Sequence, residues 1–232
     1  SIGKLYRGLI NKIDKNKFDV IVFHTPKTKQ GKIKNEIDSY TNNIVNLNGK
    51  IDNQQKQIEE QFLDIIFYPD IGMSASTYFL AHARLAPIQV ISWGHPETSG
   101  INTIDYFLSS SFIESDDSNI FYSEKLINLN RIPMFFIPPD LPSIELFRSD
   151  FQLSENKNLY CCPQSLFKIH PDFDEALDKI VNGDKDSLIL MIESKYKNLK
   201  EKLKNRWSKN HPKLNEKVVF LKRMSQENFL SL

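Results

Sequence analysis

The chain lacks the features that mark secreted, membrane and nucleic-acid-binding proteins. Two cysteines in 232 residues are too few for a disulfide framework, and no apolar run approaches the roughly 20 residues that span a bilayer. No apolar segment of a secretory signal stands at the N-terminus. The 30 Lys and Arg balance 29 Asp and Glu, so a net charge of +1 provides no overall field that attracts nucleic acid or an anionic membrane. We therefore expect a cytoplasmic protein that binds neither.

The two cysteines, Cys161 and Cys162, are adjacent in a predicted strand at 159–162. Successive side chains of a strand point to opposite faces, so the two thiols should not pair with each other. They also lack the spacing of a metal site. We interpret both as small core residues of a protein in a reducing compartment.

What the sequence does contain is an alternation of short apolar runs and amphipathic patterns. The runs predict strands at 18–23, 44–47, 65–68, 88–93 and 104–108, and the patterns predict helices at 3–13, 33–40, 52–62 and 77–85. This order predicts the α/β class, with a doubly wound parallel sheet.

A proline-rich stretch separates this part of the chain from a second α/β pattern. Residues 126–136 read as irregular, and the prolines at 133, 138, 139 and 142 lack the N–H donors of a strand ladder. Beyond them we expect strands at 159–162, 187–192 and 218–221, helices at 172–181 and 195–209, and a last helix with Ser225 as its N-cap. We divide the chain into a first lobe at 1–130, an interlobe crossing at 131–157 and the beginning of a second lobe at 158–232.

Two glycine-containing loops follow neighbouring strands of the first lobe. The carboxyl ends of parallel strands meet at one sheet edge, where ligands of open α/β sheets bind, so both loops should line a pocket. Their candidate ligand-binding residues are Asp70, Gly72, Met73 and Ser74 in one loop, and Gly94, His95, Pro96 and Thr98 in the other. A purely structural role for these residues stays open, because a lone histidine is often structural and an aspartate after proline often caps a turn.

Lys168 lies between a predicted strand and a helix that opens at Pro171. A cation beside a helix N-terminus suits a phosphate, although a single loop lysine is more often simply solvated. The basic residues of 195–209 are interleaved with glutamates and read as a solvated helix face, not a nucleic-acid patch. The sequence contains no Walker loop, G-x-G-x-x-G or G-x-S-x-G motif.

Several segments together resemble a known family. They are DIIFYPDIGM, YFLAHARLAPIQVISWGHPETSGI, IDYFLSS, YSEKLINL, LYCCPQSLFKIHPDFD and VVFLKRMSQENFL. The chain resembles the O-GlcNAc transferase, SPINDLY and HMW1C-like group of inverting protein glycosyltransferases, glycosyltransferase family 41. The resemblance implies a GT-B fold with two Rossmann-like lobes. Because two of the family's donor-site segments would fall outside residues 1–232, we expect a piece of a larger protein whose second lobe is incomplete.

The resemblance also implies roles for the candidate residues. Lys168 would neutralise the diphosphate of a UDP-sugar, and Gln164, Ser165 and His170 would contact the nucleotide. The loops 70–74 and 94–98 would lie beside the donor sugar, with His95 as a second catalytic residue. The implied reaction is transfer of one GlcNAc or glucose to Ser/Thr or Asn of an acceptor protein, with inversion.

Two alternatives to this reaction stay open. The chain could be an inactive nucleotide-sugar-binding or scaffolding module, or another GT-B enzyme such as a sugar-nucleotide epimerase. No metal is expected in the transferase reading, since no acidic pair marks a cation site and Lys168 with a helix N-terminus can supply the counter-charge.

Overall fold

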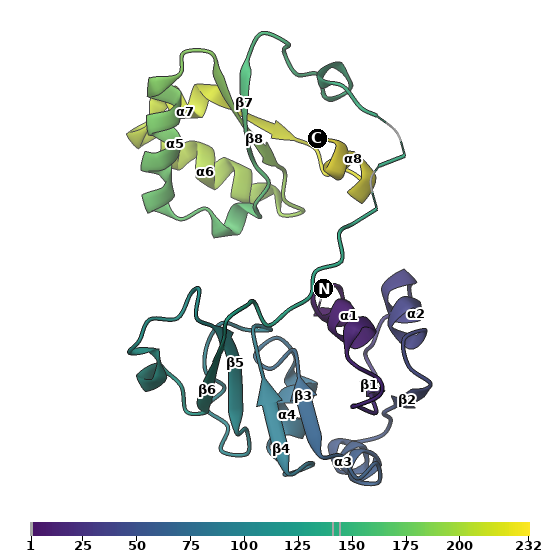
Figure 1. Ribbon diagram of the computed structural model, residues 1–232. Coiled ribbons are helices and arrows are strands. Elements are labelled where there is room, and N and C mark those ends of the chain that lie inside the picture. Colours follow the sequence, from purple (N-terminus) through teal and green to yellow (C-terminus); the bar gives the residue numbers. More distant parts are fainter. Residues whose placement is uncertain (1, 141, 144) are drawn as a thin grey trace. The chain divides into compact units, whose positions relative to one another are not determined.

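The computed structural model describes residues 2–140, 142–143 and 145–232, and the chain divides into two compact units, Ser1–Pro138 and Pro139–Leu232 (Figure 1). The point of division falls inside the stretch 131–157. Every strand pair is parallel, which confirms the predicted α/β class with parallel sheets. Within the described ranges, every helix is too short or too polar to cross a bilayer.

The first unit alternates helices and short strands as predicted, with shifted boundaries. Its elements are α1 (Ile2–Lys12), β1 (Ile21–His24), α2 (Lys32–Asp38), β2 (Asn43–Asn46), α3 (Ile51–Glu59), β3 (Ile65–Tyr68), α4 (Ala75–Ala81), β4 (Ile88–Ile91), β5 (Tyr106–Ser110), the 3-10 turn η1 (Ser118–Phe121) and β6 (Lys125–Leu129). The strands form two sheets instead of one, with β1 paired to β2 and a second sheet in the order β3-β4-β5-β6. Its core brings together Ile58 of α3, Leu80 of α4 and Phe107 of β5.

Strand β6 corrects the prediction that the chain is irregular from residue 126. It pairs with β5 along its whole length, from Tyr106 opposite Lys125 to Ser110 opposite Leu129. As the last strand of its sheet it is bonded on one side only, and Leu126 packs on the core while Asn128 is exposed. The apolar sequence signal of such a half-buried strand is weaker than the continuous apolar run of a central strand, so it is harder to predict.

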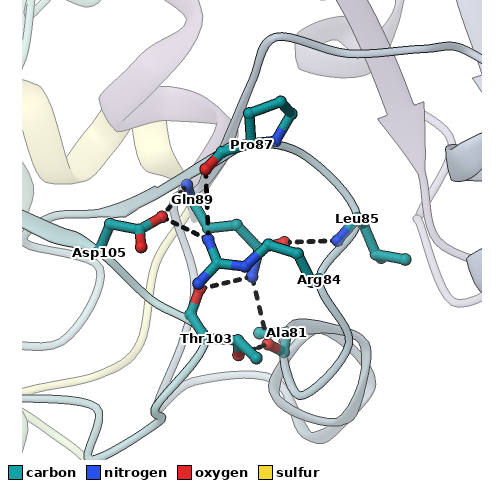
Figure 2. Close-up of polar contacts among 7 residues, drawn as sticks. All are labelled: Ala81, Arg84, Leu85, Pro87, Gln89, Thr103 and Asp105. Atoms are coloured by element: carbon teal, nitrogen blue, oxygen red, sulfur yellow. Dashed lines mark hydrogen bonds and ion pairs between the residues drawn. The ribbon is translucent and has the colours of Figure 1, made fainter.

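Helix α4 ends at Ala81, four residues before the predicted end, because a buried side chain takes over the next backbone groups (Figure 2). The Gln89 side chain is fully buried; it accepts from Leu85 N at 2.9 Å and donates to the Thr103 carbonyl at 2.8 Å. Asp105 accepts from Gln89 N at 2.7 Å and from the Arg84 guanidinium at 2.5 Å. These bonds fix the start of β4 and hence the direction in which its following loop leaves the sheet.

The second unit has the three predicted strands in the order β7-β8-β9. Its elements are the 3-10 turn η2 (Arg148–Phe151), β7 (Asn158–Cys162), the 3-10 turn η3 (Leu166–Lys168), α5 (Pro171–Gly183), β8 (Ser187–Ile192), α6 (Lys197–Asn210), α7 (Pro212–Lys217), β9 (Val218–Leu221) and α8 (Gln226–Ser231). Ser225 accepts from Asn228 N at 3.1 Å, which confirms it as the N-cap of α8. Fully buried Trp207 lies in the larger core cluster.

The core interpretation of the two cysteines is wrong for Cys161, which is exposed, whereas Cys162 is half-buried against the core around Trp207. β7 is an edge strand, and alternation directs only one of the two side chains toward that core. Both thiols are free. Partial desolvation of the thiol, and to a smaller extent the neighbouring Cys162, raise the pKa of Cys161 although its side chain is exposed.

Candidate ligand-binding sites

The two glycine loops of the first unit lie against each other. Strands β3 and β4 are neighbours, with Tyr68 opposite Ile91, so their loops leave the same sheet edge. Gly94 packs on the preceding loop so closely that a Cβ there would lie 1.8 Å from the Pro69 carbonyl oxygen. Gly72 has a φ of 87°, and a Cβ on it would lie 2.7 Å from His95 Cβ. Both positions therefore need glycine, one for space and one for space and conformation.

A pocket of about 210 Å³ opens between these loops. We call it the first-unit pocket; its lining residues are Ile71, Gly72, Tyr78, His95, Glu97, Thr98 and Ser99. Of the candidate residues, Gly72, His95 and Thr98 are thus brought together. Asp70, Met73, Ser74, Gly94 and Pro96 do not line it.

Three of the candidates outside the lining differ in their surroundings. The Ser74 hydroxyl caps α4, accepting from Thr77 N at 3.5 Å, and the Met73 side chain is 67% exposed. Asp70 Oδ1 is buried and has no hydrogen-bond partner among the described residues. Burial raises the pKa of Asp70, with partial compensation from the Thr77 side chain. Burial of the carboxyl outside the pocket lining accounts for this shift of the Asp70 pKa.

Glu124, which the sequence alone did not indicate, fixes the loop at 94–100 through hydrogen bonds. Its side chain is buried and accepts from Thr98 Oγ1 at 2.7 Å, from Ser99 N at 2.8 Å and from Ser99 Oγ. Burial opposes ionisation, but the hydrogen bonds from Ser99 and Thr98 prevail and lower the pKa of Glu124 below its usual value. The carboxylate therefore binds two residues that line the first-unit pocket.

The second unit has its own pocket, of about 280 Å³, at the carboxyl ends of its strands. This second-unit pocket is lined by residues 163–167 after β7, residues 192–196 at the end of β8, and Arg223 and Phe229 after β9. Gln164 and Ser165 are among these residues, as is Tyr196, whose ring lies 4.9 Å from Lys195 Nζ. The cations that line the pocket are Lys195 and Arg223, which sequence reasoning did not select.

Lys168 and His170 follow the lining segment 163–167 in sequence but do not line the pocket. Lys168 ends the turn η3, its side chain is exposed, and its Nζ lies 6.0 Å from the Phe167 ring centre. His170 is the N-cap of α5, where its Nδ1 accepts from Asp172 N at 3.3 Å. That cap occupies one of the helix amides that an anion would use, and Asp172 itself adds negative charge there.

A buried ion pair fixes the loop that carries Lys168. Arg206 of α6 lies 2.7 Å from Asp174 Oδ2 through Nε, and its Nη2 donates to Asp174 Oδ1 at 2.8 Å and to the Ile169 carbonyl at 3.1 Å. The residue after Lys168 is thereby attached to both α5 and α6. Across the described ranges, no group of three or more His, Cys, Asp or Glu side chains is placed to hold a metal ion.

Comparison with solved structures defines the class of fold. A mutant of the O-GlcNAc transferase of Thermobaculum terrenum matches 98% of this chain and 43% of its own, with a TM-score of 0.83 and 16% identity. The fold is therefore α/β with parallel sheets and corresponds to part of a GT-B structure. No family model matches the chain.

Curated proteins give the relationship in sequence. A UDP-glucose:protein N-beta-glucosyltransferase of Actinobacillus pleuropneumoniae serotype 5b is 30% identical over 138 residues, 58% of this chain and 21% of that protein. The probable UDP-N-acetylglucosamine–peptide N-acetylglucosaminyltransferase SEC of Arabidopsis thaliana is 33% identical over 96 residues, 38% of this chain and 10% of that protein. The chain is a relative of the protein glycosyltransferases of family 41, as the resemblance indicated, and it spans about a fifth or less of these relatives.

Proposed function

We propose that the chain forms part of the core of a UDP-sugar-dependent protein glycosyltransferase. In this proposal the two units are Rossmann-like lobes of a GT-B enzyme that transfers one glucose or N-acetylglucosamine to Ser/Thr or Asn of an acceptor protein, with inversion. The relatives named for UDP-glucose and UDP-N-acetylglucosamine transfer support this choice of donor and acceptor.

The observation that carries the proposal is the second-unit pocket. Loops from all three strands of the sheet converge there, as expected for a ligand site of an α/β fold. The pocket combines an exposed aromatic ring, Tyr196, with two cations, Lys195 and Arg223. Such a set suits a nucleoside diphosphate, because the ring can stack on a base while the cations oppose the phosphate charge.

Two placements of the diphosphate are compatible with this pocket. The family resemblance assigns it to Lys168, directly after the lining segment 163–167, where the lysine would stabilise the charge that develops on the leaving nucleotide. The lining cations, Lys195 and Arg223, offer the second placement. Both leave the nucleotide on the second unit.

The test is calorimetric titration of the whole chain with UDP. If Lys168 holds the diphosphate, Lys168→Ala should weaken UDP binding by at least about tenfold, the loss expected for one charged hydrogen bond. Lys179→Ala is the matched control, since Lys179 is also an exposed lysine and lies on α5, away from the pocket lining. The affinity of the Lys179→Ala variant for UDP should equal that of the wild type.

Three outcomes are informative. Loss of binding in Lys195→Ala but not in Lys168→Ala would move the diphosphate into the pocket and overturn the role given to Lys168. Absence of UDP binding in the wild-type chain would contradict the proposed function. Binding of UDP without transfer to an acceptor protein would favour the alternative of a binding module.

A further inference from the structure

The crossover between β5 and β6, residues 111–124, exposes four large apolar side chains. Phe112 is 71% exposed, Ile113 65%, Ile120 77% and Phe121 69%. We call these four residues the crossover patch. Its two phenylalanine rings alone present roughly 200–350 Å² of apolar surface. The largest apolar patch on a typical monomer measures about 300–600 Å², and patches of this size mark interaction sites.

Two contacts hold the crossover patch together. A backbone hydrogen bond of 3.1 Å turns the chain at 115–118. Across this turn the Tyr122 hydroxyl donates to Glu114 Oε1 at 2.8 Å. The apolar pairs at 112–113 and 120–121 directly precede the two residues that this bond joins. The four apolar side chains therefore belong to one surface and are not scattered singly.

The inner side of the crossover is already packed. Ser118 is 6% exposed, and the Tyr122 ring lies 4.7 Å from the ring of fully buried Phe107. Interiors are close-packed, so a further large side chain does not fit there without displacing these residues. The crossover patch can therefore lose its exposed area only through a contact beyond the core of this unit.

The charge of the crossover is of one sign. Residues 111–124 contain four acids and neither lysine nor arginine. Two of the acids are engaged in hydrogen bonds inside the unit, whereas Asp116 and Asp117 are exposed at the turn between the two apolar pairs. The next cation along the chain, Lys125, lies over a tyrosine ring, with its Nζ 6.0 Å from the ring centre. Two exposed carboxylates thus border the crossover patch.

We propose that the crossover patch is a docking surface for a protein segment that combines apolar side chains with Lys or Arg, as a basic amphipathic helix does. The apolar side chains of the segment would cover the patch, and its cations would pair with Asp116 and Asp117. A two-fold dimer through this patch would bring like charges together, and so would an anionic membrane. The proposal does not rest on the proposed transferase activity.

The test is titration of the ¹⁵N-labelled chain, followed by NMR, with a 14-residue amphipathic peptide of leucine and lysine. The same peptide with glutamate in place of lysine is the charge-reversed probe. The lysine peptide should shift the amide signals of the four patch residues. The glutamate peptide should bind at least about fivefold more weakly, because two attractive charge pairs become repulsive.

Two double variants separate the apolar and the charged parts of the surface. Ile120→Ser with Phe121→Ser should weaken binding of the lysine peptide by at least about tenfold, because two apolar contacts are lost. Asp116→Asn with Asp117→Asn should weaken it by about two- to tenfold and reduce its dependence on salt. All four positions are exposed, so the remaining amide signals should stay in place and report an intact fold.

The first unit offers matched controls at another exposed position. Phe62 is 91% exposed, and Glu59 and Glu60 are exposed acids close to it in sequence. Phe62→Ser, and Glu59→Gln with Glu60→Gln, should bind the lysine peptide as the wild type does. Equal losses in these controls would mean that the peptide adheres to any exposed apolar or acidic residue, and this would overturn the proposal.

The other outcomes assign the patch elsewhere or reject it. Equal binding of the two peptides, or no shift at 112–121, would overturn the proposal. Self-association seen by sedimentation and lost in the Ile120→Ser, Phe121→Ser variant would assign the patch to a second copy. Binding to phosphatidylglycerol vesicles lost in the same variant would assign it to a membrane. Each of these results leaves UDP binding by the second unit untouched, so the two proposals fail separately.

Discussion

Removing Arg206 should strongly destabilise the second unit. The Asp174 side chain is 3% exposed and that of Arg206 27%, so Arg206→Met would leave a carboxylate buried without its counter-charge while keeping the apolar stem of the side chain. Loss of one partner of a buried pair costs about 3–5 kcal/mol. Because the unfolding free energy of a domain is roughly 5–15 kcal/mol, this is a large fraction of the total. The Ile169 carbonyl also loses its donor, which should loosen the loop that carries Lys168.

Urea unfolding followed by tryptophan fluorescence measures this loss. The chain has two tryptophans, and Trp93→Phe leaves Trp207, in the core beside Arg206, as the sole reporter of the second unit. Lys157→Met is the control, because Lys157 and Asp186 form an ion pair in the same unit with side chains 33% and 64% exposed. That change should cost at most about 1 kcal/mol. An equally small loss in Arg206→Met would refute the view that the Asp174 pair is a desolvated anchor.

Two further predictions concern the first unit. Gln89→Leu should lower the unfolding free energy of this unit by at least about 2 kcal/mol, because the Leu85 N–H and the Thr103 carbonyl lose their buried partner. The loss is measured through Trp93 fluorescence, and a value below about 1 kcal/mol would contradict this. The second is a pH dependence. Burial raises the pKa of Glu124, but hydrogen bonds from Ser99 and Thr98 outweigh burial and lower this pKa below its ordinary 4.5. As the pH falls, Glu124 is therefore protonated in the unfolded chain before it is protonated in the folded one. Stability should fall as the pH drops below 4.5, less steeply in Glu124→Gln; equal slopes in both proteins would rule out this contribution.

The strands that have the predicted ends are uninterrupted apolar runs. The runs at 65–68, 187–192 and 218–221 are β3, β8 and β9, because such a run has few other places to go. The prediction failed for elements whose apolar pattern is interrupted or short. The edge strand β6 has polar residues at both exposed positions, and the six-residue helix α7 is too short to show a period.

The part of the candidate sites that lies at the ends of strands was predictable from the sequence. The loops at 70–74 and 94–100 do meet at one sheet edge, which follows from parallel pairing alone. The role of Glu124 could not be read from the sequence, since its contacts with Thr98 and Ser99 span 25 or 26 residues and depend on the pairing of β5 with β6. Lys195 was interpreted as part of a solvated helix, but it precedes α6 and faces the second-unit pocket.

The close packing of Gly94 on the Pro69 carbonyl makes the two loops of the first unit a single transferable module. Moving residues 94–100 into another α/β scaffold would also require transfer of the turn at 69–72, since the grafted loop would otherwise lose the backbone surface on which Gly94 packs. Libraries that vary ligand preference should accordingly randomise the exposed lining position Glu97 and leave both glycines unchanged.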